Sequence, residues 1–138
     1  MKWEYIIIHH SLTRDDDKLS WGAIRDYHKG KGWKDIGYHA GVEKIRGRYE
    51  VLLGRPWDRK GAHTKGYNDK AIGLCLVGDF DHRPPPCGQL VVAAELVKWW
   101  MRWFGVEREN VKGHRDFTKY KSCPGNSFSM ELFRKLLK

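Results

Sequence analysis

Two histidines and one cysteine combine side-chain types that zinc prefers with positions at strand ends or in loops. His9 follows an apolar run, His114 lies in the string KGHRD, and Cys123 lies in the string SCPG. A zinc site with three such protein ligands keeps a fourth position for water or substrate, which is the layout of a catalytic metal. His9 and His114 are too far apart in the sequence to form a local metal motif, so the spacing alone does not establish a metal site. The alternative for each histidine is a structural residue that forms hydrogen bonds inside the fold.

The apolar patterns predict the elements that must position these residues. β-Branched and aromatic residues at about 3–9 predict a strand that ends at His9. The continuously apolar segment 72–77 predicts a central strand buried on both faces of a sheet. A short segment near Val111 leads to His114.

Two further patterns lie between these strands. Ser20 is placed to cap a helix with Trp21, Ile24 and Tyr27 at helical spacing, and glycines at 30 and 32 end it. Segments 40–44 and 48–53 flank Arg46-Gly47, which is typical of a β-hairpin, and 54–70 has the composition of a loop.

A long helix is predicted over about 88–104, after a triple proline that excludes helix. Its apolar side carries Leu90, Ala94, Val97 and Met101, and we interpret its tryptophans as core and boundary residues. They are Trp99, Trp100 and Trp103. Ser127 or Ser129 begins a closing helix. Strands that alternate with helices predict an α/β fold: a single domain over residues 1–138 with a central mixed β-sheet flanked by helices.

Charge and cysteine content limit the classes of partner. The chain has 26 Lys and Arg against 17 Asp and Glu, a net charge of +9, which favours a polyanion such as nucleic acid, an anionic membrane surface or a bacterial wall. Three cysteines without a CxxC pair argue against a disulfide framework, and Cys75 reads as a buried small hydrophobe. Because residues 1–4 lead directly into a strand, we expect no export signal and no membrane insertion.

Five strings carry a resemblance that extends from about Trp3 to the final helix: IIIHHS, DIGYHAGVEK, GRPWDRKGAH, AIGLCLVGDF and GHRDF…KSCPG. In this order they closely resemble the type 2 N-acetylmuramoyl-L-alanine amidases, a superfamily that includes small phage endolysin amidases and the peptidoglycan recognition proteins. The resemblance implies the amidase fold, one Zn²⁺, and hydrolysis of the amide between N-acetylmuramic acid and L-alanine in peptidoglycan.

The resemblance also implies a role for each matching residue. His9, His114 and Cys123 would be the metal ligands, and the cysteine is typically replaced in members that bind without cutting. Tyr38 would position or deprotonate the attacking water, and Lys121 would stabilise the oxyanion, with Lys119 as its competitor. His63 and His39 would line the cleft and bind substrate, although His39 is also open to a structural role. Asp116 would either accept a hydrogen bond from a ligand imidazole or brace its loop.

Three other functions remain as alternatives. The chain could be a peptidoglycan-binding module without activity, a cysteine hydrolase that uses Cys123 and His114, or a regulator that binds a polymerase or nucleic acid. The preferred interpretation is a monomeric phage or prophage endolysin, made in the cytoplasm and released to the wall through a holin-type pore. For it we expect peptidoglycan as the partner and no binding of nucleic acid.

Overall fold

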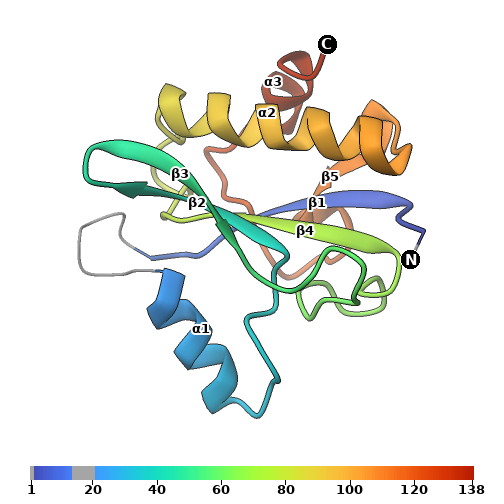
Figure 1. Ribbon diagram of the computed structural model, residues 1–138. Coiled ribbons are helices and arrows are strands. Elements are labelled where there is room, and N and C mark those ends of the chain that lie inside the picture. The colour runs from blue at the N-terminus through green and yellow to red at the C-terminus, as the bar shows by residue number, and fades with distance from the viewer. Residues whose placement is uncertain (1, 14–20) are drawn as a thin grey trace.

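A central five-stranded sheet carries helices on both faces in the computed structural model, which describes residues 2–13 and 21–138 (Figure 1). The strands are β1 (Tyr5–His10), β2 (Ala40–Ile45), β3 (Arg48–Leu53), β4 (Ala71–Leu76) and β5 (Val111–Gly113). The helices are α1 (Trp21–Gly30), α2 (Cys87–Phe104) and α3 (Met130–Lys135), with single 3₁₀ turns at Arg108–Asn110 and His114–Asp116. This architecture confirms the predicted fold class.

The order of strands in the sheet is β3-β2-β4-β1-β5. β1 pairs in parallel with β4 on one side and β5 on the other, and β2 pairs in parallel with β4 and antiparallel with β3. The predicted central strand is therefore the middle one, and all six of its residues are buried. Because β1 and β5 are parallel neighbours, the residues that follow them emerge at the same edge of the sheet.

The hairpin between β2 and β3 turns where the sequence predicts it. Arg46 and Gly47 both have positive φ, 51° and 80°. Two consecutive residues with positive φ are the requirement of a type I′ turn, whose twist suits two-residue hairpins. The turn fixes the register that opposes Ala40 to Leu53.

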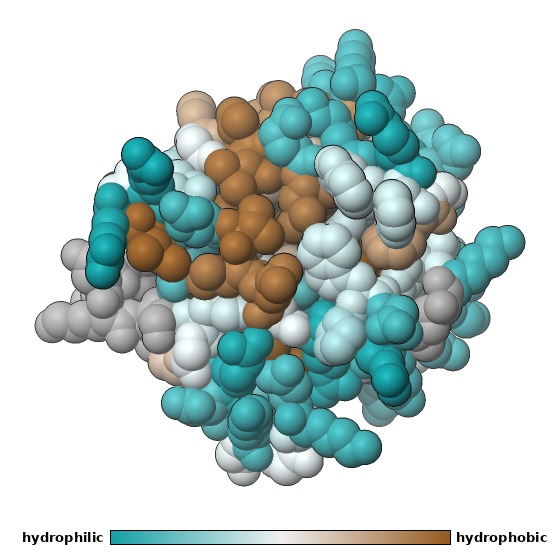
Figure 2. Space-filling model, viewed as in Figure 1, coloured by the Kyte–Doolittle hydropathy of each residue, from teal (hydrophilic) through white to brown (hydrophobic). Residues whose placement is uncertain are grey.

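The long helix α2 covers one face of the sheet (Figure 1). Ala94, Val97 and Trp100 are buried, and the helix ends at Gly105 in the left-handed conformation. Trp99 and Trp103 are 56% and 69% exposed and stack on each other, so the interpretation of all three tryptophans as core or boundary residues holds only for Trp100. Figure 2 shows apolar side chains gathered over α2 and the adjoining hairpin.

The two shorter helices differ in how their ends are held. In α3 the Ser129 hydroxyl accepts a hydrogen bond from the Leu132 amide, so of the two predicted start residues Ser129 is the cap. In α1 Trp21 and Ile24 are buried, but Tyr27 is 67% exposed, which corrects its place on the apolar face. The predicted cap Ser20 lies outside the described residues. Among the helices of the described residues, none combines the length and apolarity needed to cross a membrane.

Candidate metal centre

The three predicted zinc ligands meet at the edge of the sheet where β1 and β5 end. His9 lies near the end of β1, His114 directly follows β5, and Cys123 lies in the loop beyond it. One nitrogen of each histidine and the Cys123 sulfur all lie within 4.8 Å of one another. The His9 and His114 ring centroids are 4.7 Å apart, and His9 Nδ1 lies 3.6 Å from Cys123 Sγ.

These distances can be compared with those that a zinc ion requires. Zinc–nitrogen and zinc–sulfur bonds of about 2.0 and 2.3 Å at tetrahedral angles place two ligand atoms about 3.5 Å apart. The 3.6 Å between His9 Nδ1 and Cys123 Sγ matches this value, and all three candidate ligand atoms lie within 4.8 Å of one another. Two imidazoles and one thiol are a donor set that suits zinc, so the residues present fit the metal.

The loop that carries Cys123 is held by hydrogen bonds to neighbouring segments. The Arg115 amide donates to the Cys123 carbonyl at 2.7 Å, and the Arg115 guanidinium donates to the carbonyls of Gly125 and Phe128. On the other side, Asp81 accepts hydrogen bonds from the Ser122 hydroxyl at 2.7 Å and from the Asn126 amide at 3.0 Å. The cysteine position is therefore fixed from both sides although it belongs to no strand or helix.

Local contacts also set the other two ligands. The Asp116 carboxylate accepts a hydrogen bond from the Gly113 amide at 2.9 Å, which closes the turn carrying His114. This contact matches the loop-bracing alternative for Asp116. The backbone amide of His10 donates to Cys123 Sγ at 3.4 Å, so β1 supplies both an imidazole and a donor to the cysteine.

Burial keeps the histidines of this cluster neutral at neutral pH. It lowers the pKa of His9 well below its ordinary value, and the neighbouring His63 and His114 lower it further. Burial likewise lowers the pKa of His114 to about 4 and that of His63 to about 3. A neutral imidazole retains the lone pair that a metal needs. Burial raises the pKa of Cys123 to about 11, so its thiolate requires a compensating cation.

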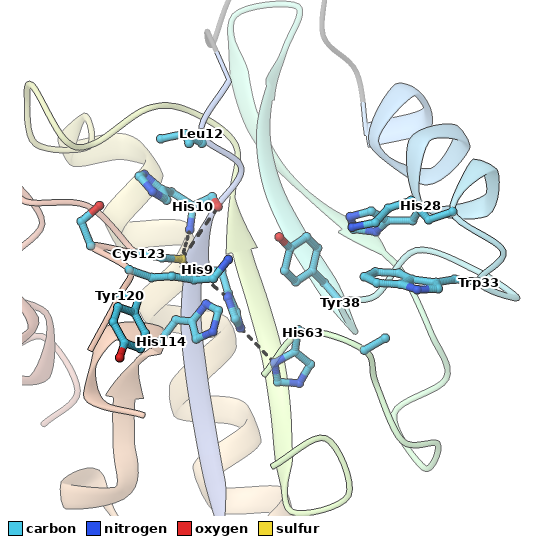
Figure 3. Close-up of a pocket in the computed structure, with 14 residues that line it drawn as sticks. His9, His10, Leu12, His28, Trp33, Tyr38, His63, His114, Tyr120 and Cys123 are labelled. Carbon is cyan, nitrogen blue, oxygen red and sulfur yellow. Dashed lines mark hydrogen bonds between the residues drawn. The ribbon is translucent and has the colours of Figure 1, made fainter. Parts of the chain in front are cut away.

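A cavity of about 400 Å³ opens over the cluster (Figure 3). Besides the three ligands, its lining consists of His10, Leu12, His28, Lys31, Trp33, Tyr38, Ala62, His63, Tyr120, Lys121 and Ser122. No sequence pattern points to the outer residues of this lining, among them Lys31, Trp33 and Tyr120. Tyr120 is 95% exposed at the cavity, and only the folded structure reveals that exposure.

The structure brings both predicted catalytic side chains to this cavity. The Tyr38 ring centroid lies 5.1 Å from that of His9. Burial raises the pKa of Tyr38 well above its ordinary value, and a hydrogen bond with the Cys75 sulfur adds to the shift, so the phenol stays protonated. Lys121 lines the cavity and its charge lowers the pKa of His114, whereas Lys119 is not part of the lining.

Of the two predicted substrate-binding histidines, only His63 reaches the cavity. His39 is fully buried; its Nε2 donates to the Arg59 carbonyl at 2.7 Å and its Nδ1 accepts from the Gly73 amide at 3.0 Å. With both nitrogens bonded to backbone, His39 is structural, which corrects the expectation that it lines the cleft. His63 is 9% exposed and its ring nitrogens also have protein partners.

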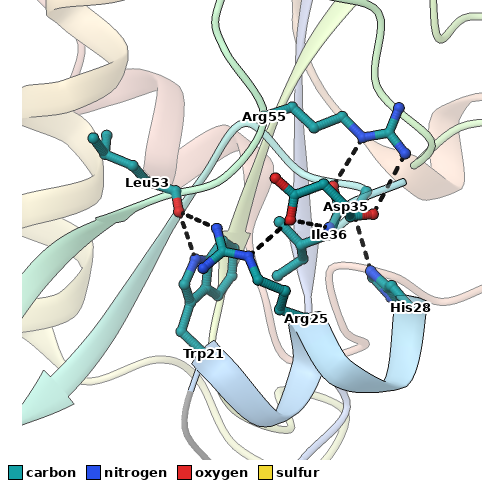
Figure 4. Close-up of polar contacts among 8 residues, drawn as sticks. Trp21, Arg25, His28, Asp35, Ile36, Leu53 and Arg55 are labelled. Atoms are coloured by element: carbon teal, nitrogen blue, oxygen red, sulfur yellow. Dashed lines mark hydrogen bonds and ion pairs between the residues drawn. The ribbon is translucent and has the colours of Figure 1, made fainter. Parts of the chain in front are cut away.

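Tyr38 follows a segment that charged and polar side chains hold in place (Figure 4). Arg25 forms an ion pair with Asp35 at 2.8 Å, and the Asp35 carboxylate also accepts from the Ile36 amide. Arg55 donates to the carbonyl of Ile36 at 2.9 Å, and His28 Nδ1 accepts from the Gly37 amide at 3.0 Å. Contacts from α1 and from the loop after β3 thus fix the backbone that leads to Tyr38.

Comparison with known proteins identifies the family. The family model described as N-acetylmuramoyl-L-alanine amidase matches residues 1–126. The chain belongs to this family. Among solved structures, the N-acetylmuramoyl-L-alanine amidase LysC from Clostridium intestinale superposes with a TM-score of 0.87 at 27% identity, over 99% of this chain and 85% of that one.

Curated relatives include proteins of two kinds. Peptidoglycan-recognition protein LB of Drosophila melanogaster is 33% identical over 141 residues, which cover 93% of this amidase-family chain and 57% of the relative. The endolysin of Klebsiella phage KP32 is 41% identical over 81 residues, which cover 59% of this chain and 52% of the relative. The chain therefore spans about half the length of the curated relatives that it matches.

Proposed function

We propose that this chain is a zinc-dependent N-acetylmuramoyl-L-alanine amidase, which hydrolyses the amide between the lactyl group of N-acetylmuramic acid and L-alanine in bacterial peptidoglycan. The observation that carries the proposal is the convergence of His9, His114 and Cys123 beneath a cavity in a chain of this family. Cys123 also favours an enzyme over a binding module, because it completes a donor set that suits a catalytic zinc.

The two histidines and the cysteine would hold the zinc through His9 Nδ1, a His114 nitrogen and Cys123 Sγ. Bound zinc supplies a Lewis acid that polarises an amide carbonyl and makes water nucleophilic near neutral pH. The protein contributes a neutral pair of imidazoles and a thiol that loses its proton on binding the cation. The hydrogen bond from the His10 amide to Cys123 Sγ stabilises the resulting thiolate.

Tyr38 and Lys121 both line the cavity over the ligand cluster and would act on the substrate there. Because its phenol stays protonated, Tyr38 acts as a hydrogen-bond donor that orients the reacting oxygen atoms, and not as a base. The Lys121 ammonium stabilises the negative charge that develops on the lactyl carbonyl oxygen as the amide is attacked. The water oxygen becomes part of the lactyl carboxyl group as the C–N bond breaks, and a proton from the same water ends on the alanine amine, which completes the hydrolysis.

We further infer an endolysin role. The support is the named endolysins among the relatives, together with a net charge of +9 that attracts the chain to anionic wall polymers. In this role the protein acts as a monomer on peptidoglycan, does not bind nucleic acid, accumulates in the cytoplasm and reaches the wall through a holin-type pore. Cleavage of the wall only after the membrane is opened would test this route.

Digestion of purified sacculi tests the activity directly. We expect a chelator to stop the release of fragments and added zinc to restore it, and mass spectrometry to find stem peptides that begin with a free L-alanine amine. Release that persists with chelator and stops on thiol alkylation would instead indicate a cysteine hydrolase. Binding to sacculi without any release in the presence of zinc would indicate a recognition module.

A further inference from the structure

We propose that His63 is a positioning residue that determines which nitrogen of His9 faces the metal, an inference that rests on the proposed zinc site. His63 lies in the loop before β4, and its ring packs edge-on against His9 with centroids 4.9 Å apart. His9 Nε2 and His63 Nδ1 are 2.9 Å apart, a hydrogen-bond distance between two atoms that can each be donor or acceptor (Figure 3). The direction of this bond decides the tautomer of His9.

A backbone carbonyl settles the direction. His63 Nε2 lies 3.0 Å from the Ala71 oxygen, and a carbonyl oxygen only accepts, so Nε2 carries the proton. The ring is buried among other histidines, a threonine hydroxyl and backbone, which favours its neutral form. A neutral imidazole carries one proton, so His63 Nδ1 is an acceptor.

The same reasoning then applies to His9. Because His63 Nδ1 accepts, the proton between the two rings belongs to His9 Nε2. His9 Nδ1 is left with its lone pair, and this is the atom 3.6 Å from Cys123 Sγ. The hydrogen bonds that link the Ala71 carbonyl, His63 and His9 therefore leave Nδ1 of His9 unprotonated and able to bind a metal. Hydrogen bonds to the far nitrogen of a ligand histidine have the same effect in metal sites.

The backbone of His63 is fixed by a single side chain. The amides of His63 and Thr64 both donate to Asn68 Oδ1, at 2.7 and 2.8 Å. The Thr64 hydroxyl lies 2.9 Å from His63 Nδ1 and 3.4 Å from His9 Nε2, so it borders the same bond. These contacts leave the ring little freedom to turn away from His9.

Two glycines independently reserve the space for the His63 ring. A Cβ atom added at Gly73 in β4 would lie 2.7 Å from His63 Cδ2, and one added at Gly61 would lie 2.6 Å from the same atom. Side chains never approach Cβ atoms so closely, hence any larger residue at either position would displace the ring. The two glycines thus keep other side chains away from two sides of the His63 ring. The nitrogens of this ring bond to the Ala71 carbonyl and to His9.

The test compares His63→Ala with His63→Asn, whose amide oxygen can replace the Nδ1 acceptor. The control is His39→Ala, which removes a ring of similar burial that also bonds to backbone but forms no hydrogen bond with His9. Long-range ¹H–¹⁵N spectra of the metal-free proteins report the tautomer of His9, and competition with a coloured chelator reports zinc affinity. Circular dichroism and thermal unfolding verify that each variant is folded.

We expect the proton of His9 on Nε2 in the parent and in His63→Asn, and a mixture of tautomers in His63→Ala. Zinc affinity should fall about 10- to 100-fold in His63→Ala, the usual effect of losing such a partner, and less in His63→Asn. His39→Ala should lower the unfolding temperature and leave zinc affinity near that of the parent.

Three outcomes would overturn the proposal: a parent with the His9 proton on Nδ1, a folded His63→Ala with parental affinity, or an equal loss of affinity in His39→Ala. If His63→Ala does not fold, the spectrum of the parent and the affinity of His63→Asn still decide. A parent that binds no zinc but carries the His9 proton on Nε2 would refute the proposed function and the metal-directing role of His63. The hydrogen bonds that link the Ala71 carbonyl, His63 and His9 would still be confirmed.

Discussion

Ile6 and Ile8 of β1 pack into the cluster beneath α2, whereas His9 between Ile8 and His10 faces the cavity on the other side of the sheet. β4 shows the same division, because Leu74 belongs to the α2 cluster and Cys75 to the smaller cluster that contains Trp21 and Ile36. Successive side chains of a strand point to opposite faces, so two strands build both the core and the candidate site.

The difference lies in what covers each face. The 18 residues of α2 cover the first face together with α3, while α1 has 10 residues and leaves the second face to loops and a cavity. Burying apolar groups under a long helix provides stability, and the polar face then tolerates neutral histidines and a thiol that contribute to chemistry. Stability and function should therefore respond to substitutions on different faces of the sheet.

The largest effect is expected from Cys123→Ala on the cavity face. We expect loss of zinc and a fall in wall hydrolysis of at least about three orders of magnitude, the scale of losing metal activation of water. The protein should remain folded, because Cys123 lies in a loop and is only partly buried. Metal analysis and turbidity of sacculi provide the measurements. Cys87→Ala is the matched control, since Cys87 is exposed, and an equal loss there would refute the assignment.

Leu74→Ala tests the opposite face. Leu74 is fully buried in the α2 cluster, so we expect a loss of about 2–5 kcal/mol in the free energy of unfolding, measured with denaturant. Zinc affinity of the folded protein should stay at the parental level. A large loss of affinity at full folding would show that the two faces are coupled.

Lys121→Met should reduce turnover about 100-fold with zinc content unchanged, the scale of losing one oxyanion donor. Lys119→Met is the control, since Lys119 does not line the cavity. Steady-state hydrolysis of a muramoyl-peptide substrate measures both variants. If Lys119→Met is the slower enzyme, the roles of the two lysines must be exchanged.

The smallest effect is a pH dependence of the metal-free protein. Burial lowers the pKa of His39 to about 4, against 6.5 in the unfolded chain. Between these values the unfolded state binds the proton and the folded state does not, so stability falls as the pH drops from 6.5 towards 4, by at most about 1.4 kcal/mol per pH unit for this group. Denaturant unfolding at pH 7 and pH 5 measures the slope, and His39→Gln should reduce it.

Sequence patterns predict most of the local structure. The apolar run before His9, the segment 72–77 and the Arg46-Gly47 turn predict two strands and a hairpin that the structure contains. These signals are local, because alternation, helical spacing and turn chemistry act over a few neighbouring residues. Burial is less local. Tyr27 has helical apolar spacing, and Trp99 and Trp103 are predicted in the core or at its boundary, but all three side chains are exposed, since packing partners decide burial.

By itself the sequence determined the strands, the helices and, through family resemblance, the set of His9, His114 and Cys123. Only the tertiary structure decided that these atoms converge, because His9 and Cys123 are 114 positions apart and meet through the parallel pairing of β1 with β5. It also decided that His39 bonds to backbone while His63 bonds to His9. Hydrogen-bond direction depends on which acceptor the fold places beside each ring, and no spacing along the chain encodes that.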